Sequence, residues 1–201
     1  MKKSLAFGFT FLLLSLLCAC AYAPTMDLSG FLQQRKRIEV PLDTGRLYQI
    51  SHASQVDYFI PLTETLSLQC LCLPSGEIYE CRVMQRKLGA DGKPVMIDED
   101  VHRSFLSECM VTLRAYCFLT TEESESILHA LSARDRTIHE KTGTNTLQTG
   151  HFTVQLLSHP LETVLSVRNE WLMESETTSQ PESVPIYDDT TATRIETVPH
   201  R

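Results

Sequence analysis

The residues best suited to acid–base chemistry lie between positions 98 and 102. Asp98, Glu99 and Asp100 place three carboxylates just before His102, and carboxylates and imidazoles are the groups that most often act as general acids and bases. The same acids precede a segment with periodic apolar residues, where carboxylates favour the positive end of a helix macrodipole. We therefore expect a helix N-terminus at this position rather than a catalytic site.

No other part of the sequence carries a familiar catalytic or nucleotide-binding pattern. None of the histidines belongs to an H-E-x-x-H pair, and the G-x-S-x-G, S-x-x-K, P-loop and G-x-G-x-x-G motifs are absent. We therefore name no catalytic residue and no cofactor. The histidines are scattered along the chain, at His52, His102, His129, His139, His151, His159 and His200.

The N-terminal residues have the pattern of an export signal. Lys2 and Lys3 precede a thirteen-residue apolar run from Leu5 to Leu17, as in a secretory signal peptide. The apolar stretch can also be read on to Ala23, nineteen residues in all, which leaves a membrane-spanning helix as the alternative. Because small residues rather than a charged flank end the stretch, we expect a signal peptide that is cleaved.

The end of this run, Leu17-Cys18-Ala19-Cys20, resembles the lipobox of bacterial lipoproteins. In a lipobox, Leu stands three positions before the Cys that is lipidated, and a small residue stands directly before it. Cys18 departs from the pattern, which more often has Ala or Ser there. The rival cleavage site is the A-x-A pattern at 21–23, but Pro24 follows it, and its tertiary amide makes a poor scissile bond. The resemblance implies lipidation at Cys20.

Lipidation at Cys20 implies a protein held on the outer side of a cell membrane. Lipoproteins of this class carry several acyl chains on the Cys, and several chains together anchor a protein stably. Ala21, rather than Asp, follows Cys20, which in this class favours the outer membrane where the organism has one. The resemblance therefore implies extracytoplasmic localisation, with the membrane as a partner through the lipid.

Five cysteines remain if Cys18 is removed and Cys20 is lipidated: Cys70, Cys72, Cys81, Cys109 and Cys117. A hairpin that turns around residues 75–76 places Cys70 opposite Cys81, with Cα atoms about 4.5 or 5.5 Å apart, within reach of a disulfide. Cys72 shares a face with Cys70, so it could bond Cys109 or Cys117. A metal site on Cys70, Cys72, Cys81 and a His is the alternative. Zinc ligand pairs more often have C-x₂₋₄-C spacing, so we expect disulfides or buried thiols and no metal.

Composition divides the chain into four parts. Residues 1–19 form the signal peptide, residues 20–35 the lipidated N-terminus and a tether, and residues 36–173 a single α+β domain. Residues 174–201 contain nine Ser/Thr and six acids, without Leu, Phe, Trp or Gly. A segment of this composition buries too little apolar area to offset its ordering entropy, so we expect a disordered, acidic, Ser/Thr-rich tail.

Local patterns within the domain predict antiparallel β-hairpins with one or two helices, which is an α+β fold. Alternating apolar residues around turn signals predict hairpins at 66–84 and 152–167. Thr120 and Glu123 fit a capping box, so a helix is expected to begin there. Residues 101–119 fit both periodicities, and we expect a helical turn followed by a strand from about Met110.

Charge and motifs together favour a binding role. The 18 Lys+Arg against 25 Asp+Glu give a net charge of -7, which provides no basic surface for nucleic acid. Arg35, Lys36 and Arg37 could contact anionic lipid headgroups, although a short basic run equally suits a solvated stretch. We expect a membrane-anchored envelope lipoprotein, a non-enzymatic binding or structural-interaction module for an unknown protein or envelope partner. An envelope enzyme of the hydrolase type, with dispersed catalytic residues, is the alternative.

Overall fold

The computed structural model describes residues 25–51 and 56–179. The signal peptide, the lipobox with Cys20 and residues 180–201 of the predicted tail lie outside these ranges. Within the described residues, no helix is both long enough and apolar enough to cross a lipid bilayer.

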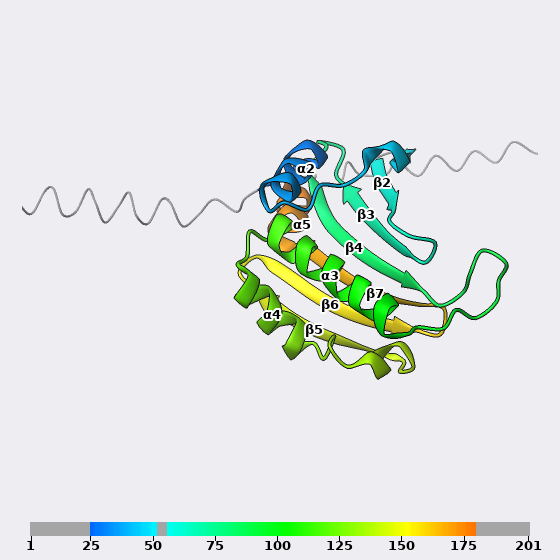
Figure 1. Ribbon diagram of the computed structural model, residues 1–201. Helices are drawn as coiled ribbons and strands as arrows, with labels where there is room; N and C mark the ends of the chain where they lie inside the picture. The colour runs from blue at the N-terminus through cyan, green and yellow to red at the C-terminus, as the bar shows by residue number, and fades with distance from the viewer. Residues whose placement is uncertain (1–24, 52–55, 180–201) are drawn as a thin grey trace, which may run out of the picture.

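Seven antiparallel strands form one sheet in the order β1-β2-β3-β4-β7-β6-β5 (Figure 1). Each of the two halves is a meander, and β4 pairs with β7 to join them. The α+β class is therefore confirmed. The strands are β1 (Tyr48–Ser51), β2 (Val56–Pro61), β3 (Leu66–Cys72), β4 (Ile78–Arg86), β5 (Gly143–Thr149), β6 (Phe152–His159) and β7 (Glu162–Asn169).

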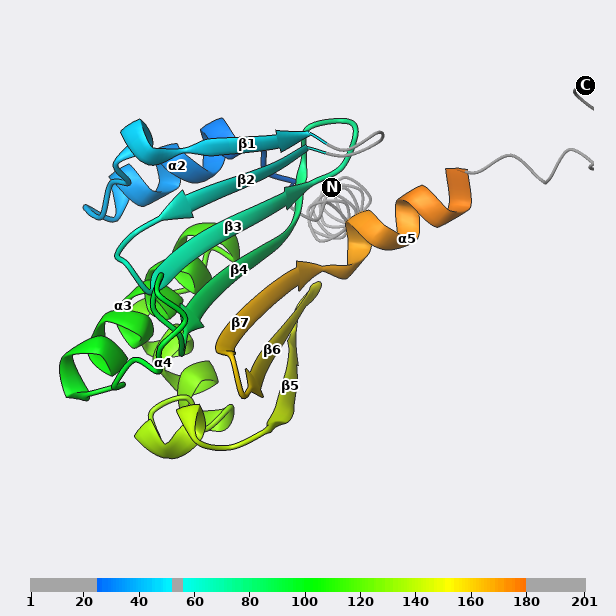
Figure 2. The same cartoon turned by 90° about the vertical axis from the view of Figure 1, so that its right-hand side faces the viewer.

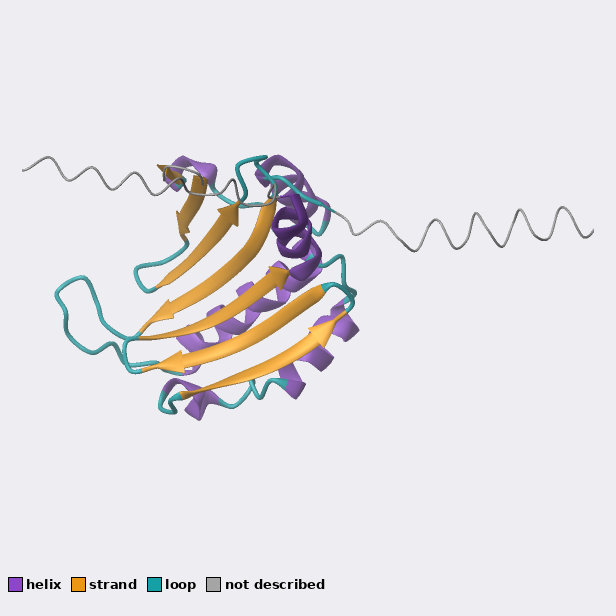
Figure 3. Ribbon diagram, turned by 180° about the vertical axis from the view of Figure 1, so that it is seen from behind, coloured by secondary structure: helices purple, strands orange, loops and turns teal. Residues whose placement is uncertain are grey.

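The helices leave one face of the sheet uncovered. Helices α3 and α4 connect the two meanders and lie on one face of the sheet. Helix α5 follows β7 and extends away from the sheet (Figure 2). Figure 3 looks onto the opposite face, where the described strands run without a helix across them. We call this the open face. The helices are α2 (Leu28–Arg37), α3 (Glu99–Tyr116), α4 (Thr121–Ala130) and α5 (Glu170–Ser179), with 3-10 turns η1 (Thr44–Arg46) and η2 (Arg136–His139).

The predicted hairpins are both present. In the first, β3 and β4 pair with Cys70 opposite Cys81, as expected from the turn at 75–76. Gly76 has φ +90 in this turn, a conformation that residues with a side chain rarely adopt. In the second, β6 and β7 pair from Phe152 opposite Asn169 to His159 opposite Glu162.

The segment 101–119 is not a helical turn followed by a strand. One continuous helix, α3, runs from Glu99 to Tyr116. This helix packs against β4, α2 and α4, so residues on several sides of it are buried. Buried Val111, Leu113 and Ala115 therefore alternate as they would in a strand. Burial on several sides, not extended backbone, explains the misleading pattern.

Both predicted boundaries of the domain need correction. The expected tether, residues 20–35, includes most of α2, whose Phe31 and Arg35 are buried. At the other end, α5 continues to Ser179, so residues 174–179 are helical rather than part of a disordered tail. Composition missed α2 because the helix is strongly polar and is held by only a few buried side chains.

The hydrophobic core lies between the sheet and α3. Tyr116 on α3 packs edge-to-face on Phe31 of α2 and Phe152 of β6, with ring centroids 6.4 and 5.3 Å apart. Its hydroxyl donates to the Ile78 carbonyl at 2.7 Å. Because these contacts join α2, α3 and both halves of the sheet, the core holds β4 and β7 side by side and so fixes the residues of the open face.

Candidate functional site

A groove runs over the open face along β4, β7 and β6. Side chains alternate between the two faces of a strand, and the pairing of β4 with β7 and of β7 with β6 aligns the outward residues in rows. The groove has a volume of about 400 Å³, within the size of small-ligand pockets. It is lined by Glu80, Arg82, Met84, Gln155, Leu157, His159, Glu162, Val164, Ser166 and Arg168.

One end of the groove is basic and is organised around a buried carboxylate. Glu80 accepts hydrogen bonds from the Ser166 hydroxyl at 2.6 Å and from Arg82 Nε at 2.7 Å. Arg168 Nε lies 3.5 Å from the same carboxylate. Burial by itself raises the pKa of Glu80, but these hydrogen bonds and the two guanidinium charges outweigh it and lower the pKa below its usual value. Glu80 is therefore ionised at neutral pH.

The middle of the groove is apolar, and its far end contains a carboxylate. Met84, Val164 and Leu157 are aligned across β4, β7 and β6. The next row outward places Glu162 between Arg86 of β4 and His159 of β6. The groove therefore runs from two guanidinium groups, over a strip of apolar side chains, to a carboxylate.

The acid cluster at 98–100 is a helix N-terminus, as expected. Asp98 caps α3, and its carboxylate accepts from the backbone N–H groups of Asp100 and Val101 at 3.0 and 2.9 Å. A carboxylate used in this way stabilises the helix. It is not the partner of His102, which points into the interior.

His102 instead forms a buried pair with His139. His102 Nδ1 lies 3.0 Å from His139 Nε2, and His139 Nδ1 lies 2.9 Å from Thr163 Oγ1. Burial lowers the pKa of both imidazoles, and for His139 the charges of His102 and Lys87 add to this and bring the pKa to about 4. Because both ring nitrogens of His139 are engaged, the pair ties α3 and η2 to β7 and leaves His139 no free nitrogen for a substrate.

Lys87 and Ser158 are a second pair of side chains whose types occur in catalytic sites. Lys87 Nζ lies 3.1 Å from Ser158 Oγ, next to a cavity of about 580 Å³ that Lys87 and His139 line. Burial lowers the pKa of Lys87, and a less basic amine beside a hydroxyl is one way to activate a nucleophile. However, the Ser158 hydroxyl donates to the Ile138 carbonyl at 2.6 Å, and Ser158 is not among the residues lining the cavity.

The three residues of the basic run at 35–37 differ in burial. Arg35 is buried and forms a bidentate ion pair with Glu108 of α3, and its Nε donates to the Val40 carbonyl at 3.2 Å. Lys36 and Arg37 are exposed. Arg35 and Glu108 also line a cleft of about 570 Å³, but they neutralise each other there. Arg35 is thus part of the core and not a lipid contact.

The cysteines lie in the core as thiols. Cys70 and Cys81 face each other with their Sγ atoms 3.9 Å apart, and the thiols of Cys72 and Cys117 interact electrostatically with Cys81. Burial raises the pKa of Cys72 to about 12. Burial and the nearby charge of Glu108 raise the pKa of Cys109. The predicted facing of Cys70 and Cys81 is confirmed, and the disulfide itself stays a prediction.

The described residues contain no group of three or more His, Cys, Asp or Glu side chains in an arrangement that could hold a metal ion. Burial raises the pKa of the Tyr116 hydroxyl, and four thiols raise it further by electrostatic interaction: Cys81, Cys117, Cys70 and Cys72. They contribute to the core at this end of α3.

Sequence reasoning missed the residues of the groove. The alternation of Cys81 and Val83 with Glu80 and Arg82 is a local signal that could have placed two charges on the polar face of a strand. The third charge, Arg168, comes from β7, more than eighty positions later in the chain. No local pattern gives the pairing of β4 with β7. No protein-family model, curated protein or solved structure matches this chain.

Proposed function

We propose that this chain is a membrane-anchored envelope lipoprotein whose folded body is a non-enzymatic binding module. The anchor in this proposal is the lipid on Cys20, supported by the lipobox resemblance of residues 17–20. The binding surface is the open face. The observation that carries the proposal is the groove on this face, a concave site with a basic end and an apolar middle.

The arrangement of the histidines supports binding rather than catalysis. An acid–base residue needs a ring nitrogen or carboxylate that reaches a substrate. In this protein His139 uses both nitrogens on His102 and Thr163, and Asp98 is used as a helix cap. The basic end and the middle of the groove present guanidinium groups and apolar side chains, which hold ligands but do not transfer protons at neutral pH. At the far end, Nδ1 of His159 accepts from the Leu161 N–H at 3.5 Å.

Mass spectrometry of the detergent-extracted full chain tests both parts of the proposal. Under denaturing conditions we expect the mass of an acylated chain that begins at Cys20, and the Cys20→Ser variant should lack the acyl mass. Under native conditions we expect a non-covalent small-molecule adduct that is lost on denaturation.

Matched variants locate the adduct. Leu157→Arg places a cation in the apolar middle of the groove and should remove the adduct, whereas Leu161→Arg changes an exposed residue in the turn after β6 and should retain it. A chain without acyl mass contradicts the anchor. An adduct equally present in the Leu157→Arg variant contradicts binding at the open face.

The alternative is an envelope hydrolase that uses Ser158 with Lys87 as its base. The 3.1 Å separation of Ser158 Oγ and Lys87 Nζ is the observation that favours it. A fluorophosphonate, which forms a covalent bond to an activated serine oxygen with loss of fluoride, tests this reading. Labelling of Ser158 that disappears in the Lys87→Met variant would support the hydrolase, and an unlabelled Ser158 supports the binding module.

A further inference from the structure

The two arginines of the groove are held in place by Glu80, but part of their hydrogen-bonding capacity is unused within the residues that the structure describes. Glu80 accepts a hydrogen bond from Nε of Arg82, and its closest contact with Arg168 is to Nε, at 3.5 Å. The Nη groups of both side chains make no hydrogen bond to any residue that the structure describes. Each side chain is more than a third exposed, at 37% and 38%. The Nη groups therefore stand at the surface of the groove, ready to donate to a ligand.

Arg82 and Arg168 are neighbours on the open face. Glu80 is paired with Arg168 and Arg82 with Ser166, so the two arginines lie diagonally across β4 and β7. Diagonal positions are about 7–8 Å apart, close enough for two long side chains to reach the same group of a ligand. Glu80 is the carboxylate among the residues that line this end of the groove, and Asp57 of β2, which does not line it, also interacts electrostatically with Arg82.

The rest of the groove limits the ligand further. The strip formed by Met84, Val164 and Leu157 offers contact to an apolar body and has no donor or acceptor in its side chains. Among the residues that line the groove, the far end presents Glu162 and His159, with Arg86 opposite Glu162, so an anionic group is best placed on the two arginines at the other end. A volume of about 400 Å³ suits a small molecule rather than a protein surface.

We infer that the groove binds a small anionic amphiphile, with a carboxylate or phosphate head on the Nη groups of Arg82 and Arg168 and an apolar body along Met84, Val164 and Leu157. Glu80 and Ser166 are positioning residues that orient the guanidinium groups. Arginine suits this role because its planar donors match both carboxylate and phosphate oxygens. The inference rests on the proposed function, because it names the ligand class of the same groove.

The test compares probes that share an eight-carbon chain and differ in the head group. The full chain in phosphatidylcholine nanodiscs is titrated with octanoate, octyl phosphate, 1-octanol or octyltrimethylammonium, with ligand-observed NMR as the readout and empty nanodiscs as the blank. We expect octanoate, octyl phosphate or both to bind, and the stronger of the two identifies the head group. 1-Octanol and octyltrimethylammonium should bind at least about tenfold more weakly. Inorganic phosphate alone tests the head without the body and should also be weaker.

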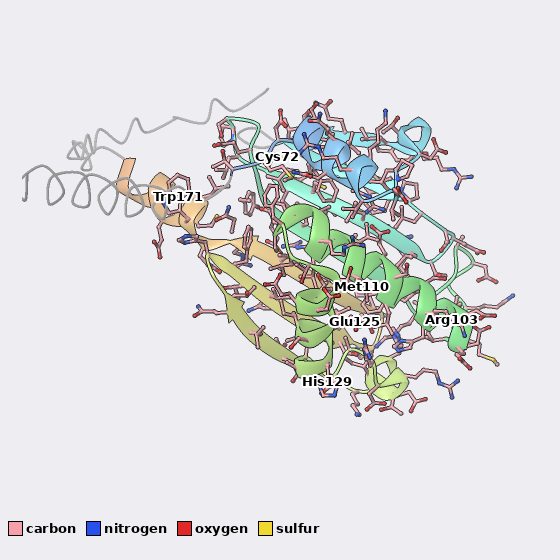
Figure 4. The ribbon with its side chains drawn as sticks, turned by 60° about the vertical axis from the view of Figure 1, so that its left-hand side comes forward. Cys72, Arg103, Met110, Glu125, His129 and Trp171 are labelled. Atoms are coloured by element: carbon pink, nitrogen blue, oxygen red, sulfur yellow. The ribbon has the colours of Figure 1, made fainter. Side chains whose placement is uncertain are left out.

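Variants assign the binding to the groove. Replacing both arginines, Arg82→Gln with Arg168→Gln, should weaken binding about tenfold or more. Arg103→Gln is the matched control, because Arg103 is exposed on α3, outside the groove (Figure 4). Since the double variant removes the partners of buried Glu80, a second variant, Leu157→Glu, keeps both arginines and places a negative charge on the apolar strip. Leu161→Glu is its control, and melting curves identify variants that do not fold.

Three results would overturn the inference: equal binding of octyltrimethylammonium and octanoate, binding unchanged in both the arginine and the Leu157→Glu variants, or no binding of either anionic probe. The proposed function is tested separately by the native adduct and the acyl mass. An adduct that depends on the groove, together with no binding of the anionic probes, leaves the binding module standing and rejects this ligand class. Probe binding by a chain without an acyl group rejects the anchor and leaves the ligand class standing.

Discussion

Single residues in this protein carry chemistry that their sequence context hides. Arg35 reads as the start of an exposed basic run, yet with Glu108 it forms the one ion pair among the described residues in which both side chains are buried. His102 reads as the partner of an acid cluster, yet its partner is His139. In both cases one partner lies on α3 and the other on a different element, so the partner could not be found from neighbouring positions.

Removing one partner of the buried pair should destabilise the fold strongly. Arg35→Met leaves the Glu108 carboxylate buried without its counter-charge, and we expect a loss of about 3–5 kcal/mol in the free energy of unfolding. Adding Glu108→Leu should recover much of that loss, because the unpaired charge is then gone. Arg37→Met is the control on the exposed side of α2. Urea unfolding followed by circular dichroism measures all four proteins, and a double variant no more stable than Arg35→Met would contradict the account.

The buried histidine pair predicts a loss of stability in mild acid. Burial, with the charges of His102 and Lys87, lowers the pKa of His139 to about 4 in the folded state, below its ordinary value of 6.5. A histidine whose pKa is depressed by folding stabilises the fold fully above the unfolded pKa, and this contribution is lost as pH falls from 6.5 toward 4. Each proton taken up on unfolding adds a slope of about 1.4 kcal/mol per pH unit.

Urea midpoints measured between pH 7 and pH 4 test this prediction. The decline in stability should become shallower in His139→Gln, and it should be unchanged in His129→Gln, because His129 is exposed on α4 (Figure 4). A profile for His139→Gln that is identical to that of the unchanged chain would show that this imidazole does not control the acid response.

The core thiols should be unreactive in the folded protein. The thiolate is the reactive species, and burial raises the pKa of Cys72 to about 12 and that of Cys81 well above its usual value. Any Cys70–Cys81 bond must therefore form before the core closes. For protein matured outside the cytoplasm, alkylation after denaturation should find three free thiols, or one if Cys72 is also paired, and reduction should restore five. Five thiols without reduction would contradict the disulfides.

Local elements were predictable where neighbouring residues determine them. The turn at 75–76 sets the register of β3 with β4, and the capping box at Thr120 and Glu123 begins α4 as expected. The second half of α3 was not predictable, because burial on several sides imitates a strand. Edge strands β1 and β5 were missed for the opposite reason, since most of their residues are exposed and show no alternation of burial.

The start of α4 provides a test at the scale of the element. The Thr120 hydroxyl accepts from the Glu123 N–H at 3.2 Å, and the Glu123 carboxylate accepts from the Thr120 N–H at 2.8 Å. Thr120→Ala should lower the free energy of unfolding by about 1 kcal/mol. Thr121→Ala, one position inside the helix, is the control and should change stability by less. Equal effects of the two substitutions in thermal unfolding would show that the cap is not what stabilises this end.

At the scale of the whole molecule, the fold separates a covered face from an open one. α3 and α4 cover the core side of the sheet, and the internal polar contacts of His139, Ser158 and Arg35 all lie on that side. The groove lies on the other side. Its position depends on the pairing of β4 with β7, which joins segments about eighty residues apart, so the sequence could suggest the polar face of one strand but not the site.

The central claim is that ligands bind on the open face, and methyl NMR tests it most directly. In the full chain in nanodiscs, octanoate should shift the methyl signals of Met84, Leu157 and Val164 in a saturable manner, and should leave those of Leu128 and Ile138 unchanged, because both are buried on the helix-covered side. Saturable shifts confined to residues around His139 or Arg35, or no saturable shift at any methyl group, would contradict the account.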